Sequence, residues 1–541
     1  MGRGIFLGQS VQVYFAIFML TKVKKFLTPA KIILLIEAAT VFLAAFGLIP
    51  KEAVLFLSGL LLFYFLFAPT SQAVLIFIAS VPLFVALPFS AGFDHMANWR
   101  LFALAIFLAW FCRRGFWRFS FWRAKLKQPL FTNFNVFEIL GWLFFGSLLV
   151  SLLASVDLIA GLKKIAFLVN IFLLYPVVKD LLRRYKNFWQ RLLRVLGVAV
   201  FWVLLVGLVQ LVFVFFRPLF VFWQYWAGRF VDAFYGSGLA KLLSFSNTWF
   251  AYNDVQPPTL RLFSVFPDSH SFALFLILTL PALIVLGYFS AKKWIKRITL
   301  LLVGGAFLGI VLSGSRGAWL SFIVAAGVAL LIFLLVTDRR PLALTNILVL
   351  VIFLGTFGLS LIYPSTLFWA QSYQTGEGDM TGSLAFLKRV KSISDTRELS
   401  NHGRLQIWES SVKSVAEHPL LGVGVGNFPV VLGEDFSVLK RGASAHNLFL
   451  DFGAESGVLS MVLLLFIFLE IFKMIWRVFL RTADKKIALL FISFFIYIAW
   501  ALGYSLFDVV LLNDKVLLIF VVSLAIINFN FQKDEKSGAN Q

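Results

Sequence analysis

The chain alternates long apolar runs with short polar stretches. Apolar runs of roughly 17–22 residues recur, the length that an α-helix needs to cross the hydrocarbon core of a bilayer, whereas barrel strands would alternate over about 10 residues. The pattern predicts an all-α polytopic membrane protein with about 14 transmembrane helices, within a range of about 12–14. The predicted spans are approximately residues 32–48, 53–68, 72–90, 100–112, 136–153, 161–178, 194–216, 271–290, 298–313, 318–336, 344–362, 447–471, 487–505 and 514–531.

The longest polar interruption lies between an apolar run ending near Tyr363 and another beginning near Asn447. We expect one large loop there, residues 364–445, that carries short helices. Residues 403–417 fit a helix ended by Pro419, because four apolar residues recur at helical spacing and form one stripe: Leu405, Trp408, Val412 and Val415. The opposite, polar face would carry Arg404, Glu409, Ser411 and Ser414.

The composition excludes an ordinary soluble protein. Hydrophobic residues make up 60% of the chain and charged residues 14%, and the mean hydropathy is +0.91. The net charge of +22 would suit nucleic acid, but the basic residues cluster in short loops between apolar runs. That placement is typical of topology signals and contacts with anionic lipid, so we expect the bilayer, and no nucleic acid, as the partner.

The basic clusters also predict the topology. Under the fourteen-span interpretation they all fall on one side, together with both termini, and the positive-inside rule makes that side the cytoplasm. The outward segments are then 91–99, the aromatic-rich 217–261, the turn 313–317 and the large loop. The aromatic-rich segment suits a helix lying in the membrane interface with its rings at headgroup depth, and a short N-terminal apolar run at 11–20 suits another interfacial helix.

Three residues at the outward interface are candidates for chemistry: Arg261, Arg316 and His446. Arg316 lies between Gly314 and Gly317, which let the backbone turn tightly. Arginine at a helix end is most often an anchor, and a lone histidine is usually a structural hydrogen-bonding group. Two guanidinium groups near one imidazole would instead bind a phosphate-bearing headgroup beside a general base.

Further residues leave their roles open. Arg404 is either a phosphate or sugar contact or a solvated charge, and Asn447 adjoins the histidine as a possible substrate contact. Glu455 is another candidate contact, although pairing within the bundle suits it better than catalysis. No metal and no cofactor is expected, because the acidic pairs of the large loop lack well-spaced histidines. Three glycines there do not follow the GxGxxG spacing and indicate a turn that allows close backbone approach: Gly422, Gly424 and Gly426.

Four stretches together resemble the O-antigen ligase and O-antigen polymerase superfamily of bacterial membrane glycosyltransferases. They are RLFSVFPDSHSFA (261–273), SGSRGAW (313–319), GRLQIW with EHPLLGVGVGNF (403–428) and HNLFLDFGAESG (446–457). The chain departs from the family at Asp268, where asparagine usually follows the proline, and in having more spans than the usual twelve or so. The resemblance divides the chain into N-terminal helices with an outward loop at 217–260 (1–260), a catalytic region (261–470) and C-terminal helices with a cytoplasmic tail (471–541).

The resemblance implies a GT-C-like fold in the bacterial inner membrane, with the active site facing the periplasm. Members transfer a glycan from undecaprenyl diphosphate to an acceptor, which is lipid A-core for ligases and another repeat unit for polymerases. His446 matches the catalytic histidine, and Arg261 and Arg316 match the arginines that contact the diphosphate. A metal-independent, inverting single displacement is the expected reaction.

The alternatives within this class are a repeat-unit polymerase of exopolysaccharide or O-antigen and a protein O-oligosaccharyltransferase. A flippase or transporter of lipid-linked glycans is the alternative of a different class. It would need ionisable residues in the middle of the membrane, for which Glu37 is the clearest candidate.

Overall fold

A computed structural model of the chain describes residues 28–88, 96–116, 134–244, 248–251, 259–362, 393, 399–433 and 443–539. Over these residues the chain is helical except for short irregular segments and one antiparallel pair of two-residue strands, β1 (Phe250–Ala251) and β2 (Thr259–Leu260). Ten helices of this described part are long and apolar enough to cross a membrane. The prediction of a helical, multi-pass membrane protein is therefore confirmed. The N-terminal apolar run at 11–20 lies outside the described residues.

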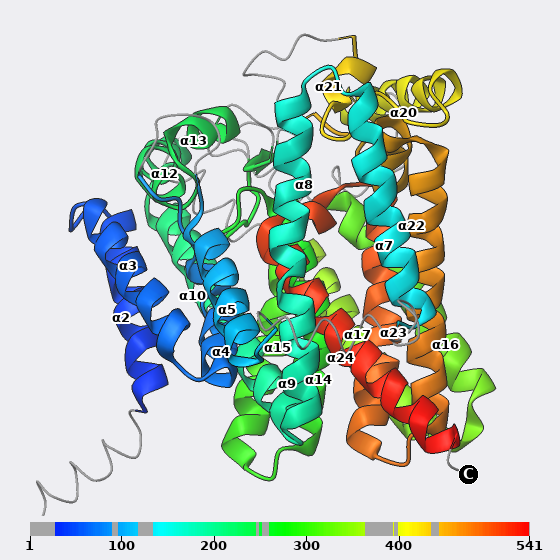
Figure 1. The fold of residues 1–541 in the computed structure, drawn as a ribbon. Helices are drawn as coiled ribbons and strands as arrows, with labels where there is room; N and C mark the ends of the chain where they lie inside the picture. Colours follow the sequence, from blue (N-terminus) through cyan, green and yellow to red (C-terminus); the bar gives the residue numbers. More distant parts are fainter. Residues whose placement is uncertain are drawn as a thin grey trace, which may run out of the picture.

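Ten helical segments correspond to the last ten predicted spans and run side by side through the molecule (Figure 1). They are α7 (Val136–Ser151), α8 (Leu158–Phe172) with α9 (Leu174–Arg184), α10 (Phe188–Phe216), α14 (Ser269–Phe289), α15 (Lys293–Leu312), α16 (Arg316–Leu335), α17 (Arg340–Ile362), α22 (Leu448–Arg481), α23 (Lys485–Ser505) and α24 (Asp514–Ala539).

The four N-terminal runs also form helices, each shorter than the roughly 20 residues of a typical span. They have 17, 16, 10 and 16 residues and are α2 (Pro29–Ala45), α3 (Glu52–Phe67), α4 (Thr70–Ala79) and α5 (Asn98–Arg113). The third run is irregular, as its prolines predict, because α4 is followed by the 3₁₀ turn η1 (Val81–Leu83). Glu37 lies buried on α2, where Ser80 donates a hydrogen bond to it.

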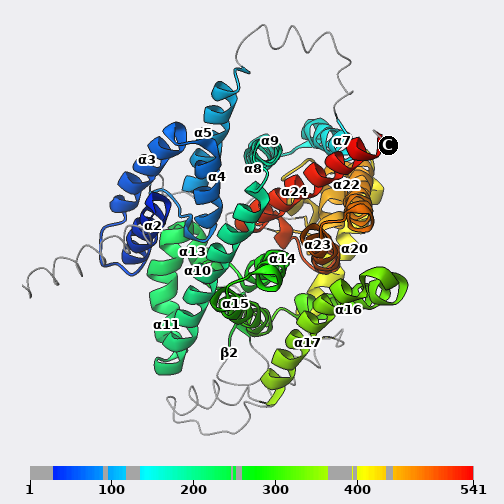
Figure 2. The same ribbon diagram turned by 90° about the horizontal axis from the view of Figure 1, so that it is seen from below.

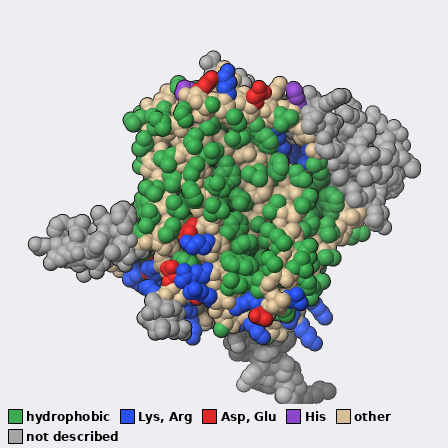
Figure 3. Space-filling model, turned by 90° about the vertical axis from the view of Figure 1, so that its right-hand side faces the viewer, with side chains coloured by type: hydrophobic (Ala, Val, Ile, Leu, Met, Phe, Trp, Pro, Cys, Tyr) green, Lys and Arg blue, Asp and Glu red, His purple; other side chains and the backbone are tan. Residues whose placement is uncertain are grey.

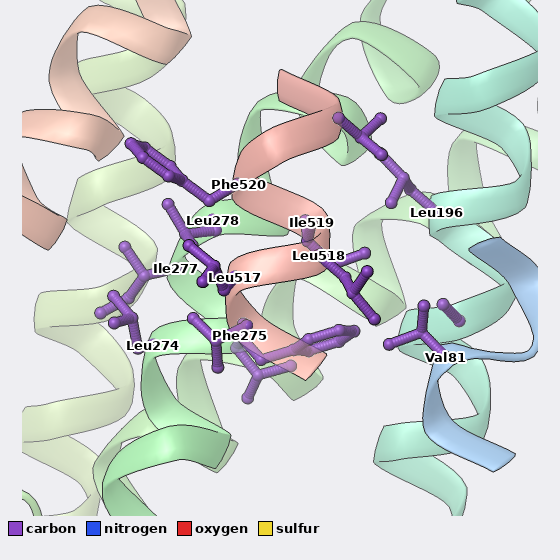
Figure 4. Packing of buried hydrophobic residues seen from close by; sticks show 14 of the residues in the cluster. Val81, Leu196, Leu274, Phe275, Ile277, Leu278, Leu517, Leu518, Ile519 and Phe520 are labelled. Atoms are coloured by element: carbon purple, nitrogen blue, oxygen red, sulfur yellow. The ribbon is translucent and has the colours of Figure 1, made fainter. Parts of the chain in front are cut away.

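The centre of the bundle is formed by α14, α23 and α24. About four fifths of each of these spans is buried (78%, 83% and 83%), and the other helices surround them (Figure 2). Leu278 of α14 lies beside Leu517 and Phe520 of α24 (Figure 4). In lipid, helices associate through close packing, because apolar side chains gain little by leaving a hydrocarbon solvent. Gly309 allows such close packing of α15 on α14, since a Cβ at this position would lie 2.9 Å from the Phe272 ring.

The aromatic-rich segment, for which one helix was expected, is a series of short helical elements. It forms α11 (Leu219–Tyr225), the π-helical turn η3 (Trp226–Val231), α12 (Asp232–Tyr235) and α13 (Ser237–Ser244). Phe222, Trp226 and Phe230 are buried and stack at helical spacing, with ring centroids 5.0 and 4.3 Å apart. The interfacial position of this segment stays a prediction, because burial against the protein does not fix the depth of these rings in a membrane. Rings four residues apart on one helical face pack on each other and on the protein, although Phe220 stays exposed.

Two helices cap the end of the bundle drawn uppermost in Figure 1: α20 (Leu399–Glu417) and α21 (Phe428–Val431). The apolar stripe predicted for α20 is buried only in part, since Trp408 and Val415 are half-buried. Leu405 and Val412 are 46% and 56% exposed, whereas Ser411 and Ser414 are buried at 0% and 6%. The small serines let α20 approach α22 closely, and Arg404 lies on the same side of the helix as Ser411, seven residues away.

The described basic clusters meet at the opposite end of the bundle, as predicted. Polar contacts join them across the chain: Arg114 pairs with Asp180, Arg339 donates to the carbonyl of Leu480 at 2.9 Å, and Arg477 pairs with Asp534 at 3.5 Å. Figure 3 shows lysine and arginine side chains gathered at this lower end. The molecule therefore has one basic end and one end covered by α20 and α21.

We predict that these two ends lie on opposite sides of the membrane, with the basic end inside. In a Cys112→Ser background, Lys413→Cys on α20 should react with a membrane-impermeant maleimide in intact spheroplasts. Lys485→Cys, at the start of α23, should react only after permeabilisation. Labelling of both positions from the same side would contradict the topology.

Candidate active site

Arg261 is buried directly after β2 and is held by the turn that follows α15. Its backbone N–H donates to the carbonyl of Trp249 at 2.7 Å, and its Nε donates to the carbonyl of Ser313 at 3.1 Å. Ser313 is the C-cap of α15, where unpaired carbonyls carry partial negative charge that attracts a cation. Two stretches singled out in the sequence, 261–273 and 313–319, are thereby joined.

Arg316 begins α16 at this same turn. Gly314 has φ +61°, which glycine adopts without strain, and the hydroxyl of Ser315 caps the helix. Gly317 serves a different purpose, because a Cβ there would lie 2.9 Å from the ring of Tyr504 on α23. The tight turn predicted from Gly314 is present. The close approach at Gly317 also brings Arg316 next to α23.

A carboxylate that the sequence analysis missed connects the site. Asp508 lies between α23 and the 3₁₀ turn η5 (Val510–Leu512). One carboxylate oxygen is 3.4 Å from Nδ1 of His270, and the other is 3.9 Å from Nδ1 of His446. Nε2 of His270 is in turn 3.0 Å from Nη2 of Arg261. Arg261, His270, Asp508 and His446 thus form one continuous chain of contacts.

His270 is fixed by hydroxyl groups as well. Its Nδ1 lies 2.9 Å from the Tyr504 hydroxyl and 3.1 Å from the Ser315 hydroxyl, and those two hydroxyls are 2.5 Å apart. Such a network orients a buried imidazole and leaves it little freedom. His270 is therefore the buried histidine of the pair and His446 the accessible one, with 40% of its side chain exposed.

His446 precedes α22 in a strained conformation. Its φ is +48°, in the left-handed region, which costs a residue other than glycine about 1–2 kcal/mol. Asn447 is the N-cap of α22, and its side-chain oxygen accepts from the N–H groups of Phe449 and Leu450 at 3.0 and 3.1 Å. The cap defines where the helix begins and so places His446, the residue before it, at the end of the bundle.

Positive charge dominates this group of residues. Burial, with the nearby charges of Arg316 and Arg404, lowers the pKa of Arg261 to about 10, so the guanidinium stays charged at neutral pH. Burial by itself would raise the pKa of Asp508, but His270, His446 and Arg404 outweigh it and hold that pKa below its usual range. Asp508 is therefore ionised and serves as the counter-charge of the cluster.

The structure brings together most of the predicted site residues. Arg261, Arg316, Arg404 and His446 all belong to the cluster, and Arg404 reaches it because α20 turns that side of the helix inward. Glu455 is bonded elsewhere, to Lys164 at 2.5 Å and to the backbone N–H of Gly426 at 3.0 Å. Among the described residues, no group of three or more His, Cys, Asp or Glu is arranged to hold a metal ion.

Depth in the membrane could have identified the missed residues. Asp508 is the first acidic residue after the predicted span at 487–505, at its outward end, and His270 lies at the outward start of the span at 271–290. Ionisable side chains at such positions are costly unless they are paired, which makes them candidates for a site. Their pairing with each other required the fold.

A helical bundle with a cluster of cationic side chains at one end of its spans defines a multi-pass membrane protein. Residues 298–465 match a family model described as O-Antigen ligase. The exopolysaccharide production protein ExoQ of Rhizobium meliloti (strain 1021) is 24% identical over 199 residues, which cover 34% of this chain and 45% of ExoQ. The chain thus spans less than half the length of that relative.

The match over residues 298–465 and the likeness to ExoQ agree with the resemblance to the O-antigen ligase and polymerase superfamily that the motifs indicated. Arg316, Arg404 and His446 lie inside the matched region, whereas Arg261 and Asp508 lie outside it, before and after. The site therefore combines residues of the family region with residues from its flanks.

Asp268 generates a prediction about stability and pH. It is the N-cap of α14, accepting from the N–H of Ser271 at 2.6 Å, and burial raises its pKa to about 6. Because the folded state binds this proton more tightly than the unfolded state, stability falls as the pH rises from the ordinary pKa of 3.8 to about 6, and the full loss remains at higher pH. A shift of about two pKa units corresponds to on the order of 3 kcal/mol.

Asn caps a helix as well as Asp, so Asp268→Asn should keep the cap and remove this penalty. We expect a higher melting temperature than wild type at pH 8 and no difference near pH 4, measured by thermal shift in detergent. Asp268→Ala is the control that loses the cap. A lower melting temperature for Asp268→Asn at pH 8 would contradict the assignment.

Proposed function

We propose that this protein is a membrane glycosyltransferase that moves a glycan from undecaprenyl diphosphate to a hydroxyl group of an acceptor sugar. The observation that carries the proposal is the contact chain from Arg261 through His270 and Asp508 to His446, with Arg316 and Arg404 beside it. It supplies the two things such a transfer needs, a base and an anion-binding group. The O-antigen ligase match supports the same reaction class.

His446 is the proposed general base. Its imidazole accepts the proton of the acceptor hydroxyl while that oxygen attacks the anomeric carbon of the donor. The bond from that carbon to the diphosphate oxygen breaks, and undecaprenyl diphosphate leaves with the bonding electron pair. Asp508, 3.9 Å from Nδ1, stabilises the imidazolium that forms. A single displacement of this kind inverts the anomeric configuration.

The three arginines are proposed to bind the diphosphate. Guanidinium groups form paired hydrogen bonds with phosphate oxygens and stabilise the charge that develops on the leaving group. The N-termini of α14, α16 and α22 lie at this site. Their unpaired N–H groups and helix dipoles favour an anion. Together these groups take the role that metal ions perform in other transferases.

The proposed setting is the bacterial inner membrane, with both termini in the cytoplasm and the site at the periplasmic side. The separation of the basic end from the end bearing α20 and α21 supports this orientation. In a GT-C-like arrangement of helices, the carrier lipid would stay in the outer leaflet while its headgroup reaches the arginines. The acceptor of a ligase of this kind is lipid A-core or a similar glycolipid.

A repeat-unit polymerase is the second candidate, and the likeness to ExoQ favours it, because that relative is described as an exopolysaccharide production protein. The chemistry is unchanged, and the acceptor becomes a second lipid-linked glycan. The purified full chain, incubated with a lipid-linked oligosaccharide and either acceptor, separates the two. A ligase produces a capped glycolipid, and a polymerase produces a ladder of longer lipid-linked chains on a gel.

We predict that His446→Ala lowers the transfer rate by about 10²–10⁴-fold, the usual contribution of a general base. Membrane insertion should be unaffected, because the side chain is partly exposed at the surface. His402→Ala, on the exposed side of α20, is the matched control and should keep the wild-type rate. The assay is product formation per mole of folded protein, and a near-wild-type rate for His446→Ala would refute the base assignment.

We also predict that the reaction continues in EDTA, because the arginines neutralise the leaving group. Arg316→Lys should clearly lower the transfer rate, since an ammonium group cannot form the paired hydrogen bonds of a guanidinium. The anomeric configuration of the product, read by NMR coupling constants, should be inverted relative to the donor. Retention of configuration, or full loss of activity in EDTA with recovery on adding Mg²⁺, would contradict this mechanism.

A further inference from the structure

Three charged side chains form a buried cluster beside the site that the proposed mechanism does not use. Lys164 of α8 lies 3.2 Å from a carboxylate oxygen of Asp451 and 2.5 Å from one of Glu455, both on α22. The two carboxylates are 3% exposed and the lysine 21%. Asp451 and Glu455 are four residues apart, so they lie on one face of the helix and repel each other unless a cation sits between them.

Each carboxylate also holds a loop of the site. Asp451 accepts the backbone N–H of Ala445 at 3.0 Å, and Glu455 accepts that of Gly426 at 3.0 Å. Ala445 directly precedes His446, and its carbonyl accepts from the indole N–H of Trp408 at 3.0 Å. The peptide before His446 is therefore fixed on both sides. This contact matters because His446 adopts a left-handed backbone that its neighbours must maintain.

The glycine loop is clamped against the same helix pair. A Cβ at Gly426 would lie 2.8 Å from the carbonyl of Ala160, and one at Gly422 would lie 2.5 Å from the carbonyl of Ala454. Asn427 accepts from the backbone N–H of Asp157 at 2.7 Å and donates to its carbonyl at 3.2 Å. The close approach that the glycines predicted is thus an approach to α8 and α22.

We propose that Lys164 is a positioning residue for His446, acting through Asp451 and the peptide at Ala445. By lying between the paired carboxylates, it holds Asp451 where that carboxylate accepts the Ala445 N–H. Without the lysine, Asp451 would be a buried carboxylate without its cationic partner and would move away from the Ala445 N–H, so the histidine would lose its fixed position. Lys164 lies outside the matched family region, so this device comes from the N-terminal half of the chain.

The proposal rests on the proposed function, and kinetics test it in the purified full chain. Lys164→Met should lower kcat by about 100-fold with KM for the donor unchanged, because a small misplacement of a catalytic group has that effect. Lys164→Arg should restore most of the rate, and Lys163→Met, on the exposed side of α8, should keep it. In a His446→Ala background, Lys164→Met should cause no additional loss. An additional loss there would show a general structural role and overturn the proposal.

Hydrogen exchange gives a second measurement that does not depend on activity. Lys164→Met should accelerate amide exchange in the peptide covering 443–451, whereas Lys164→Arg and Lys163→Met should not. Unchanged exchange together with unchanged kcat would overturn the proposal. If the wild-type protein shows no glycosyl transfer but exchange responds as expected, the proposed function fails and the positioning role stands.

A substitute variant covers the case in which Lys164→Met does not insert into the membrane. The pair Lys164→Met with Glu455→Gln removes one cation and one anion, so the net charge of the cluster is unchanged. It still deprives Asp451 of its partner and should show the same loss of kcat and the same faster exchange. Wild-type values for both would contradict the role given to Lys164.

Discussion

The carboxylate of Asp508, placed between His270 and His446, is the interaction on which the site depends. Around it gather three guanidinium groups that would otherwise repel each other at the end of an apolar bundle. The anion lets α14, α20, α22 and the loop after α23 meet in one place. An excess of positive charge still remains, and under the proposed function that excess would attract a multiply charged headgroup.

The site residues occupy the ends of helices rather than their middles. Arg261 is bonded to the C-cap of α15, Arg316 begins α16, and His446 stands immediately before the N-cap of α22. Helix ends are where backbone N–H and carbonyl groups lack partners, so capping side chains are required there in any case. Capping, turn geometry and charge placement thus act together, and a change in one displaces the others.

Residues inside the matched region and residues before and after it both contribute to the site. The matched residues carry His446, Arg316 and Arg404, but the buried partner of the histidine, Asp508, follows the match, and Arg261 and His270 precede it. Lys164 and the end of α8 support the glycine loop from still earlier in the chain. The N-terminal half is therefore part of the construction of the site as well as of the bundle.

The sequence alone determined the helical membrane class, the last ten spans and the common end of the basic clusters, because span length and charge placement are local properties. It also singled out Arg261, Arg316 and His446, since each stands at the edge of an apolar run. The pairings of Asp508 and Lys164 came only from the tertiary structure, because both join residues far apart in the chain. The inward face of α20 was likewise decided by packing: close approach to α22 buried Ser411 and left Leu405 exposed, which helical periodicity had no means to foresee.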